Sequence, residues 1–393
     1  MSIQKTGSGD PMRFEFATAT RVIFGTGVLR EFQPAQFGKR ALVVGGRTAS
    51  RLSPLFEILD RAGVAFDHYA VDGEPTLDLI SRGIDAARKN QADFVIGFGG
   101  GSSIDAGKAI AAMMNNPGDL TEYLEVIGNS KPLLHPPLPY IAIPTTAGTG
   151  AEATRNAVLA SPSHRLKVSV RSPLMLPRLA LVDPELTKEL SPALTASTGM
   201  DALTQLIEPY VSIRANAMTD ALCLDGLRRV ARSLRRACST PEDMTARTDM
   251  SLASLFSGMA LANAGLGAVH GFAAAIGGMF SAPHGAICAV LLAPVIRANI
   301  EVLRHQQPIS EHLARYREIG RLLTGKPEAE AKDAIEWVAQ LCQDLHIPRL
   351  SSYRISRNDA GEICRKAAAT SSMKGNPVVL DQRELESILT EAL

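Results

Sequence analysis

Three residues far apart in the chain, Asp201, His270 and His284, are of types that bind a catalytic transition metal. Both histidines lie in GAVHGFAAAIGGMFSAPHGAICAVLLAPV, one of the least polar stretches of the sequence. Gln205 follows Asp201 by one helical turn and would project from the same face of a helix. A carboxylate and two neutral imidazoles with an open fourth position suit zinc or ferrous iron, so these residues predict a metal centre with Gln205 as a candidate fourth ligand.

Each of these residues also has a purely structural interpretation. Asp201 follows Thr198 at the spacing of a capping box, which would place its carboxylate in the first turn of a helix. A lone buried histidine is usually a hydrogen-bonded core residue, and Gln205 could lie on a helix surface. The occurrence of an acid and two histidines together, in an apolar region, favours a role with a metal or a polar substrate.

Two halves of the chain with different periodicities must position these side chains. Up to about residue 185, short apolar runs alternate with amphipathic segments, which predicts βαβ units and a parallel sheet. The predicted strands are 41–46, 66–71, 93–101, 140–146 and 179–183. Beyond them only helical periodicity is found, in 194–211, 221–238, 245–265, 312–325, 331–345 and 383–393. We expect a disordered lead-in at 1–12, an α/β domain at 13–185 and an all-helical domain at 186–393.

A glycine-rich turn joins a predicted strand to a predicted helix in the α/β half. Gly99, Gly100 and Gly101 lie in GFGGGSSIDAGKAIAAM, and they allow a ligand to approach the backbone closely. The free N–H groups and the positive end of the helix dipole would suit a pyrophosphate. The spacing is neither GxGxxG nor that of a Walker loop. A tight connection is the alternative, but the strand before it and the helix after it favour phosphate binding.

A second polar cluster, PTTAGTGAEAT, follows a later predicted strand and carries Thr145, Thr146 and Thr149. Such a loop on its own is usually a polar turn. At the carboxyl end of a strand in an open α/β sheet, however, it lies where ligands bind.

The end of the first predicted strand bears on the choice between NAD and NADP. An acid at the end of an early strand commonly binds the adenosine ribose and repels a 2′-phosphate. Here the strand ends in Gly45-Gly46-Arg47, without an acid, and Arg47 could pair with a phosphate. This pattern favours NADP(H), although Arg47 could equally be an ordinary surface residue.

Composition excludes several classes of partner. A formal net charge of +1, from 41 basic and 40 acidic residues, gives no electrostatic case for nucleic acid or an anionic membrane. The apolar span 261–296 is interrupted by histidines, a proline and glycines, which favours two buried helices joined by a turn over a membrane span. The five cysteines lack CxxC spacing, and the N-terminus lacks an apolar signal segment. We expect a cytoplasmic protein with mostly inert buried thiols.

With these motifs in order, the chain resembles the iron-containing (group III) alcohol dehydrogenase family over essentially its whole length. The stretches that carry the resemblance are GFGGGSSIDAGKAIA, PYIAIPTTAGTGAEAT, LALVDPELT, STGMDALTQLIEPYVS, AVHGFAAAIGGMFSAPHGAICAVLLAPV and GNPVVL. The resemblance implies a Rossmann-like dinucleotide-binding domain followed by a helical domain, an architecture similar to that of dehydroquinate synthase, with the active site between them. It also implies a homodimer and reversible hydride transfer between NAD or NADP and a small alcohol or aldehyde.

The resemblance also assigns roles to individual positions. The metal, Fe²⁺ or Zn²⁺, would be held by Asp201, His270 and His284. The residues implied in cofactor binding are Gly46, Arg47, Gly99, Gly100, Gly101, Ser102, Ser103, Thr145, Thr146, Thr149 and Lys167. Gly46 stands where many family members carry the ribose-binding aspartate, which again favours NADP(H).

Two positions depart from the family pattern. Gln205 stands where most members have a third histidine ligand, and Ala274 stands where they have a histidine that helps to relay protons. A glutamine carbonyl is a weaker ligand than imidazole for iron or zinc, so metal affinity should fall without necessarily vanishing. Two alternatives to a metal-dependent alcohol dehydrogenase therefore stay open. One is a metal-independent keto-acid reductase similar to maleylacetate reductases, and the other is a nucleotide-binding relative that has lost catalysis.

Overall fold

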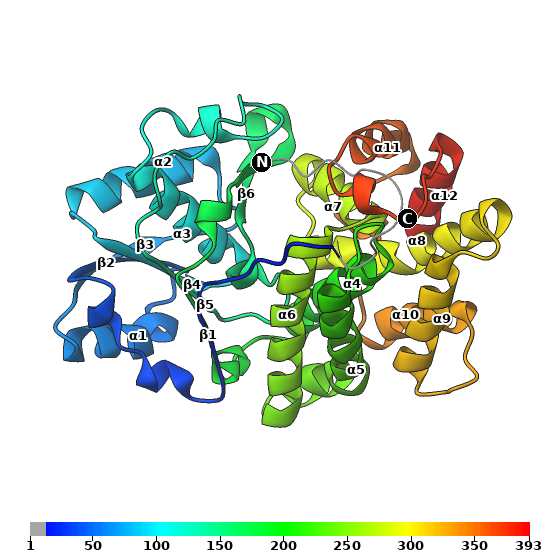
Figure 1. Cartoon of the computed structure of the whole chain (residues 1–393), viewed down its shortest axis with the longest axis horizontal. Coiled ribbons are helices and arrows are strands. Elements are labelled where there is room, and N and C mark those ends of the chain that lie inside the picture. The colour runs from blue at the N-terminus through cyan, green and yellow to red at the C-terminus, as the bar shows by residue number, and fades with distance from the viewer. Residues whose placement is uncertain (1–12) are drawn as a thin grey trace.

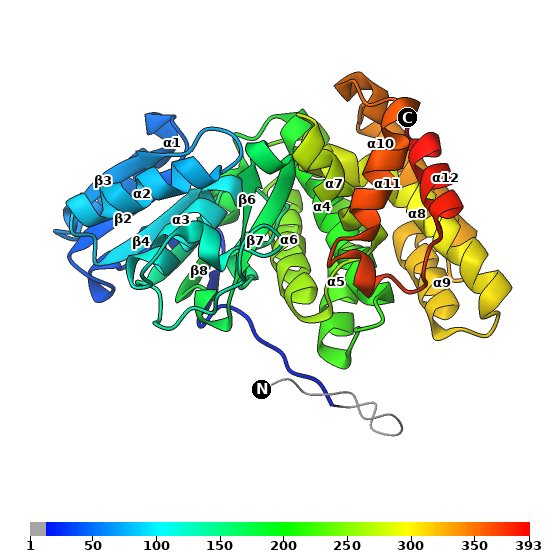
Figure 2. The same cartoon turned by 90° about the horizontal axis from the view of Figure 1, so that it is seen from above.

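The computed structural model describes residues 13–393, so the predicted lead-in at 1–12 lies outside the described residues. The first half forms a six-stranded parallel sheet with the strand order β1-β8-β5-β4-β2-β3 (Figures 1 and 2). Its strands are β1 (Val22–Phe24), β2 (Arg40–Gly45), β3 (Ala65–Ala70), β4 (Phe94–Gly99), β5 (Tyr140–Pro144) and β8 (Leu179–Val182).

Helices cover both faces of this sheet, because its central strands are apolar on both sides. On β2, Leu42 and Val44 belong to one core cluster, and Ala41 and Val43 belong to another. The first cluster includes residues of α2 (Leu77–Lys89) and α3 (Gly101–Met114), and the second includes residues of α1 (Ala49–Arg61). The predicted βαβ organisation is therefore confirmed.

All five predicted strands are present, but the sequence analysis missed three others. One is the three-residue β1, and the other two are the antiparallel hairpin of β6 (Asn156–Ser161) and β7 (Leu166–Arg171). Every second residue of β6 is buried, which is the period-2 pattern of a half-covered strand. The predicted strand 93–101 was too long, since Gly101 is already the first residue of α3.

The second half is helical, as predicted, and within residues 13–393 no strand follows β8. Its helices are α4 (Pro192–Val211), α5 (Ala217–Ser239), α6 (Met244–Ala264), α7 (Ala268–Met279), α8 (His284–Gln306), α9 (Glu311–Thr324), α10 (Ala331–Asp344), α11 (Ala360–Ala368) and α12 (Gln382–Ala392). Helix α11 was not predicted from the sequence. The expected boundary at residue 185 lies in the segment between β8 and α4.

Within residues 13–393, α8 is long and apolar enough by composition to cross a membrane, with a mean hydropathy of 1.9 over its most apolar window, and α6 with α7 would qualify if that bent pair were one span. However, 78% of that window is buried inside the fold, where α8 packs against α4, α7, α10 and α12. The expected pair of buried helices is therefore confirmed as α7 and α8, and the chain between them is only residues 280–283.

Candidate active site between the two halves

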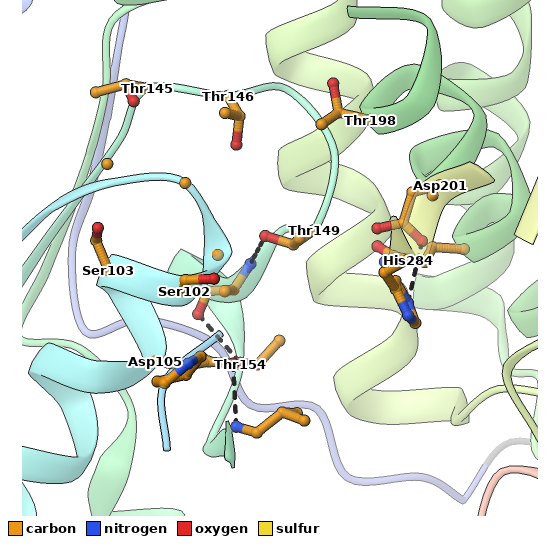
Figure 3. Close-up of a pocket in the computed structure, with 18 of the residues that line it drawn as sticks. Ser102, Ser103, Asp105, Thr145, Thr146, Thr149, Thr154, Thr198, Asp201 and His284 are labelled. Atoms are coloured by element: carbon orange, nitrogen blue, oxygen red, sulfur yellow. Dashed lines mark hydrogen bonds and ion pairs between the residues drawn. The ribbon is translucent and has the colours of Figure 1, made fainter. Parts of the chain in front are cut away.

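A cavity of about 1870 Å³ lies between the sheet half and the helical half. Figure 3 shows its two walls, with Ser102, Thr146 and Thr149 on one side and Asp201 and His284 across from them. The lining includes every residue that the sequence analysis proposed for the cofactor or the metal, with the exception of Arg47. The cavity thus brings together side chains that are far apart in the sequence.

The glycine turn lies at the carboxyl end of β4 and the start of α3, and it forms part of one wall of the cavity. Gly99 has a φ of 152°, which disfavours residues with a side chain. A Cβ on Gly101 would lie 2.8 Å from Thr149 Cγ2, so the turn and the threonine loop are packed too closely for any larger residue. The three glycines line the cavity and add no side chain of their own at the start of α3, where a pyrophosphate site needs free N–H groups.

The threonine loop is fixed to the glycine turn by a backbone hydrogen bond in which Thr145 N–H donates to Gly99 O at 2.9 Å. Lys108 of α3 also holds the threonine loop in place. It is fully buried in α3, and its Nζ donates to Ala151 O at 2.8 Å and to Thr154 Oγ1 at 2.9 Å. The Lys108 ammonium is therefore a structural clamp that shapes the wall, which was not apparent from its place after the glycine turn.

The candidate cofactor residues outside the glycine turn and the threonine loop separate into two groups. Gly46 lines the cavity, and a Cβ built on it would have no neighbour within 4 Å. Arg47 does not line the cavity and instead pairs with Asp72 at 3.1 Å, on the exposed surface. Lys167 lines the cavity and pairs with Glu74 at 2.7 Å. The open space beside Gly46 leaves room for a group larger than a ribose hydroxyl.

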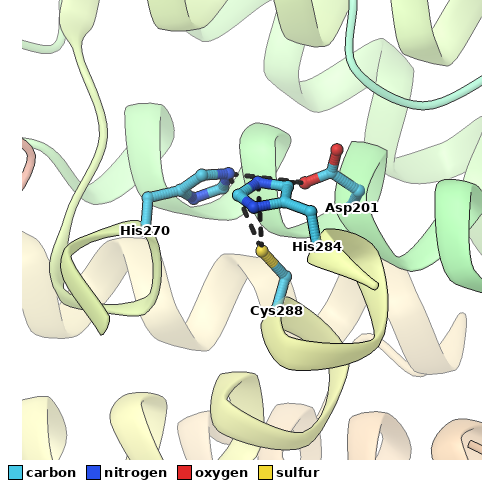
Figure 4. A group of neighbouring side chains, drawn as sticks. All are labelled: Asp201, His270, His284 and Cys288. Atoms are coloured by element: carbon cyan, nitrogen blue, oxygen red, sulfur yellow. Dashed lines mark hydrogen bonds and ion pairs between the residues drawn. The ribbon is translucent and has the colours of Figure 1, made fainter. Parts of the chain in front are cut away.

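The three candidate metal ligands meet on the opposite wall (Figure 4). Asp201 comes from α4, His270 from the first turn of α7 and His284 from the first residue of α8. Asp201 Oδ1 lies 3.4 Å from His270 Nε2 and 3.6 Å from His284 Nε2. Because Asp201 Oδ1 is buried and has no hydrogen-bond partner among the described residues, the residues present fit a metal ion, which would satisfy it.

The capping-box interpretation of Asp201 is wrong. Helix α4 starts at Pro192, and its N-cap is Ser191, whose hydroxyl accepts a hydrogen bond from Leu194 N–H. Asp201 therefore lies in the middle of the helix, only 2% exposed, where no N-terminal N–H group needs it. A buried carboxylate at such a position requires a cationic partner.

Glu208, two turns after Asp201 on α4, was missed by the sequence analysis. Its carboxylate accepts hydrogen bonds from His270 Nδ1 at 2.6 Å and from Val269 N–H at 2.7 Å. In a neutral imidazole, a carboxylate that accepts from Nδ1 leaves Nε2 as the free ligand atom, which is how metal-binding histidines are usually oriented. The signal in the sequence was an acid seven residues after Asp201, on the same face of an apolar helix.

Gln205 and Ala274 both line the cavity. The Gln205 side chain is buried, and its Oε1 accepts a hydrogen bond from Ser257 Oγ on α6 at 2.9 Å. Gln205 is therefore not a helix-surface residue, and its role as a metal ligand stays a prediction. Ala274 leaves its part of the cavity without an imidazole.

Cys288 is the second residue that the sequence analysis missed at this centre. One turn after His284 on α8, it is fully buried, and its Sγ lies 3.7 Å from His284 Nε2 and 3.9 Å from His270 Nε2. Four of the five cysteines are buried, as expected, and of these Cys288 lies at the cluster while Cys223, Cys238 and Cys364 lie away from it; their inertness stays a prediction.

The acid and histidines perturb one another strongly. Burial raises the pKa of Asp201, but His284 and His270 outweigh it and bring that pKa below its usual value. Burial lowers the pKa of His284 to about 4. Burial also disfavours a charged His270, but Cys288, Glu208 and Asp201 raise its pKa well above the usual value. His284 is therefore neutral at pH 7, as a metal ligand must be. Without a metal, the extra proton of the cluster resides on His270 Nε2, and metal binding would displace it.

Comparison with known proteins identifies relatives along the whole chain. Residues 19–184 match the family model described as iron-containing alcohol dehydrogenase, and residues 195–393 match the model of the C-terminal part of the Fe-containing alcohol dehydrogenase family. The 1,3-propanediol dehydrogenase of Klebsiella pneumoniae is 34% identical over 366 residues, which cover 90% of this chain and 92% of that protein. The lactaldehyde reductase of Escherichia coli K12 is 34% identical over 86% of this chain and 88% of its own.

Solved structures have the same fold. A crystal structure of 1,3-propanediol oxidoreductase superimposes with a TM-score of 0.89, at 30% identity, over 97% of this chain and 100% of that one. The alcohol dehydrogenase of Oenococcus oeni gives a TM-score of 0.88, also at 30% identity, over 97% of this chain and 100% of its own.

Proposed function

Since the chain belongs to the iron-containing alcohol dehydrogenase family, we propose that it is an NAD(P)-dependent oxidoreductase that interconverts a small alcohol and its aldehyde with the help of a divalent metal. The observation that carries this proposal is the pairing of two sites across one cavity. A glycine turn suited to a pyrophosphate faces a buried acid and two histidines suited to a metal.

The residues divide the work between the two walls. The backbone N–H groups of Gly101, Ser102 and Ser103 would bind the diphosphate, and Thr145, Thr146 and Thr149 would contact the phosphates and the nicotinamide end. Asp201, His270 and His284 would hold the metal. When bound, the metal supplies Lewis acidity toward the substrate oxygen, and the nicotinamide supplies or accepts the hydride.

The residues at positions 208 and 274 determine how protons are held and exchanged near the metal. Glu208 holds the Nδ1 proton of His270, which leaves the Nε2 lone pair for the metal. With Ala274 in place of an imidazole, water in the open cleft would exchange the proton of the substrate oxygen.

NADP(H) is the cofactor that we propose as preferred. The support is the open space beside Gly46 at the end of β2, where no acid stands to repel a 2′-phosphate. Arg47 gives less support than the sequence suggested, because it pairs with Asp72 outside the cavity lining. A homodimer and a cytoplasmic location are further expectations from the sequence that stay predictions.

The test is the oxidation of NADPH and NADH by the purified protein with a panel of short-chain aldehydes and keto acids. The proposal expects turnover with at least one aldehyde and the reverse reaction with the matching alcohol. Tight binding of the dinucleotide without turnover of any substrate would instead favour a relative that has lost catalysis.

A second candidate, a keto-acid reductase that works without a metal, is favoured by the charge of the cavity wall. Arg155, Arg214 and Lys374 line the cavity, and within residues 13–393 none of them has an acidic partner at ion-pair distance. Such cations would suit a carboxylate on the substrate. If this second candidate is correct, kcat/KM for a keto acid should exceed kcat/KM for the matching aldehyde. The activity should also be unchanged after treatment with a chelator.

A further inference from the structure

We propose that the thiolate of Cys288, and not the carbonyl of Gln205, is the fourth protein ligand of the divalent metal. The inference rests on the proposed function only in placing a metal at Asp201, His270 and His284. Figure 4 shows the Cys288 Sγ pointing to the same small space as the two imidazoles and the carboxylate. One ligand atom from each of the four residues lies within 4.8 Å of every other.

The distances agree with a single ion among these atoms. Metal bonds of about 2.1 Å to nitrogen or oxygen, at the tetrahedral angle, separate two such ligand atoms by about 3.4 Å. Asp201 Oδ1 lies 3.4 and 3.6 Å from the two histidine Nε2 atoms. A bond of about 2.3 Å to sulfur puts a nitrogen and a sulfur ligand about 3.6 Å apart. The two distances from Cys288 Sγ, 3.7 and 3.9 Å, are close to that value.

Independently of the cysteine, the unpartnered oxygen of Asp201 points to a missing cation. Its Oδ1 is buried, and no described residue donates a hydrogen bond to it. The Asp201 side chain is only 3% exposed, so bulk water does not solvate this atom. A buried charged oxygen is costly without a cation beside it, and a metal ion shared with His270 and His284, whose Nε2 atoms lie 3.4 and 3.6 Å away, would supply that charge.

The Gln205 carbonyl already has a partner outside the cluster, although one of its two lone pairs stays available. Its Oε1, the atom that would bind a metal, accepts the hydroxyl hydrogen bond of Ser257 on α6. The amide nitrogen that remains is a donor and cannot bind a cation. Cys288 has no comparable commitment, because among the described residues its Sγ is in hydrogen-bond range of members of the cluster itself, His270 and His284.

Binding by Cys288 also balances charge. On binding, the S–H bond breaks, its proton leaves to solvent and the sulfur electron pair forms the bond to the metal. The carboxylate of Asp201 and the thiolate of Cys288 then neutralise the two positive charges of the ion. Because thiolate is a soft ligand, the set favours zinc over ferrous iron.

X-ray absorption of the full-length protein, freed of metal and reloaded with one equivalent of Zn²⁺, tests this directly. We expect one sulfur scatterer at about 2.3 Å together with nitrogen and oxygen scatterers near 2.1 Å. Cys288→Ser should lose the sulfur scatterer and bind Zn²⁺ at least about tenfold more weakly. Cys342→Ser is the matched control, since it removes a mostly buried thiol that donates to Ala289 O, outside the cluster, and should keep the sulfur scatterer.

The outcomes separate this inference from the proposed function. Zinc bound only by nitrogen and oxygen in the wild-type protein would refute the role of Cys288 and leave the three-residue metal site standing. A wild-type protein that binds no Zn²⁺ would refute both. The wild-type spectrum decides the matter even if Cys288→Ser fails to fold. Gln205→Ala, in which the sulfur scatterer should persist, would contradict the inference if it lost the metal as completely as Cys288→Ser.

Discussion

Replacing Glu208 by glutamine should weaken metal binding although Glu208 is not itself a ligand. Its two oxygens accept from His270 Nδ1 at 2.6 Å and from Val269 N–H at 2.7 Å. Glutamine has the same size but only one acceptor oxygen, so its NH₂ group must face one of these two donors. If the oxygen stays with Val269, the NH₂ group donates to Nδ1 and forces the proton of His270 onto Nε2, the atom that should hold the metal.

The size of the effect follows from the contacts that are lost. Removing the outer partner of a metal-binding histidine typically lowers metal affinity by about 10 to 100-fold, or about 1.4 to 2.8 kcal/mol. The helix α7 also loses a carboxylate at its N-terminus, which is worth about 0.3 to 1 kcal/mol of stability. We therefore expect a large change in zinc affinity and only a small fall in the melting temperature.

The assay is competition for Zn²⁺ against a chelator of known affinity, alongside titration with NADPH. Glu208→Gln should raise the zinc Kd by about 10 to 100-fold and leave the NADPH Kd within about twofold. Glu391→Gln makes the same chemical change at an exposed ion pair with Arg297, at 3.3 Å, and should alter neither. Unchanged zinc affinity in Glu208→Gln would mean that His270 is not oriented, or not used, as a ligand.

Two further predictions concern the nucleotide wall. Gly46→Asp places a carboxylate in the open space at the end of β2. We expect kcat/KM with NADPH to fall by on the order of tenfold, and kcat/KM with NADH to be maintained or to rise. An equal fall for both cofactors would contradict the proposed site of the 2′-phosphate. Burial raises the pKa of Asp105 from 3.8 to about 6, so the folded protein binds more protons there than the unfolded chain, and this residue's contribution to stability falls as the pH rises from about 4 to 6. The test measures the free energy of unfolding of Asp105→Asn and of wild type by denaturant across this pH range. The value for Asp105→Asn minus that for wild type should rise with pH by at most about 3 kcal/mol. A difference that does not change with pH would refute the raised pKa of Asp105.

The sequence was sufficient for the division of the fold because the two halves differ in periodicity over long segments. Apolar runs such as 41–46 and 140–146 are too short for core helices, and they alternate with amphipathic segments, so a parallel sheet was the consistent solution. The hairpin of β6 and β7 was missed because only every second residue of β6 is buried and its strands lie outside the main sheet. Pairing of this kind depends on tertiary contacts more than on local propensity.

For the site, the residue types were sufficient to predict the members of the cluster but not its partners. Asp201, His270 and His284 stood out because charged or titratable groups are rare in apolar helices. Glu208 and Cys288 lie in the same apolar helices, one at helical spacing from Asp201 and the other from His284. A glutamate near a helix end and a buried cysteine are individually unremarkable, so only the packing of α4 against α7 and α8 reveals that both face the same centre.

The central claim is that the metal bound by Asp201, His270 and His284 is required for the reduction of an aldehyde by NADPH. It is tested most directly by titrating metal-free protein with Zn²⁺ or Fe²⁺ while following NADPH oxidation. We predict that activity rises from near zero to a plateau at one ion per chain, and that Asp201→Asn gains no activity over the same range. Full activity in the metal-free protein, unaffected by added ions, would contradict the account.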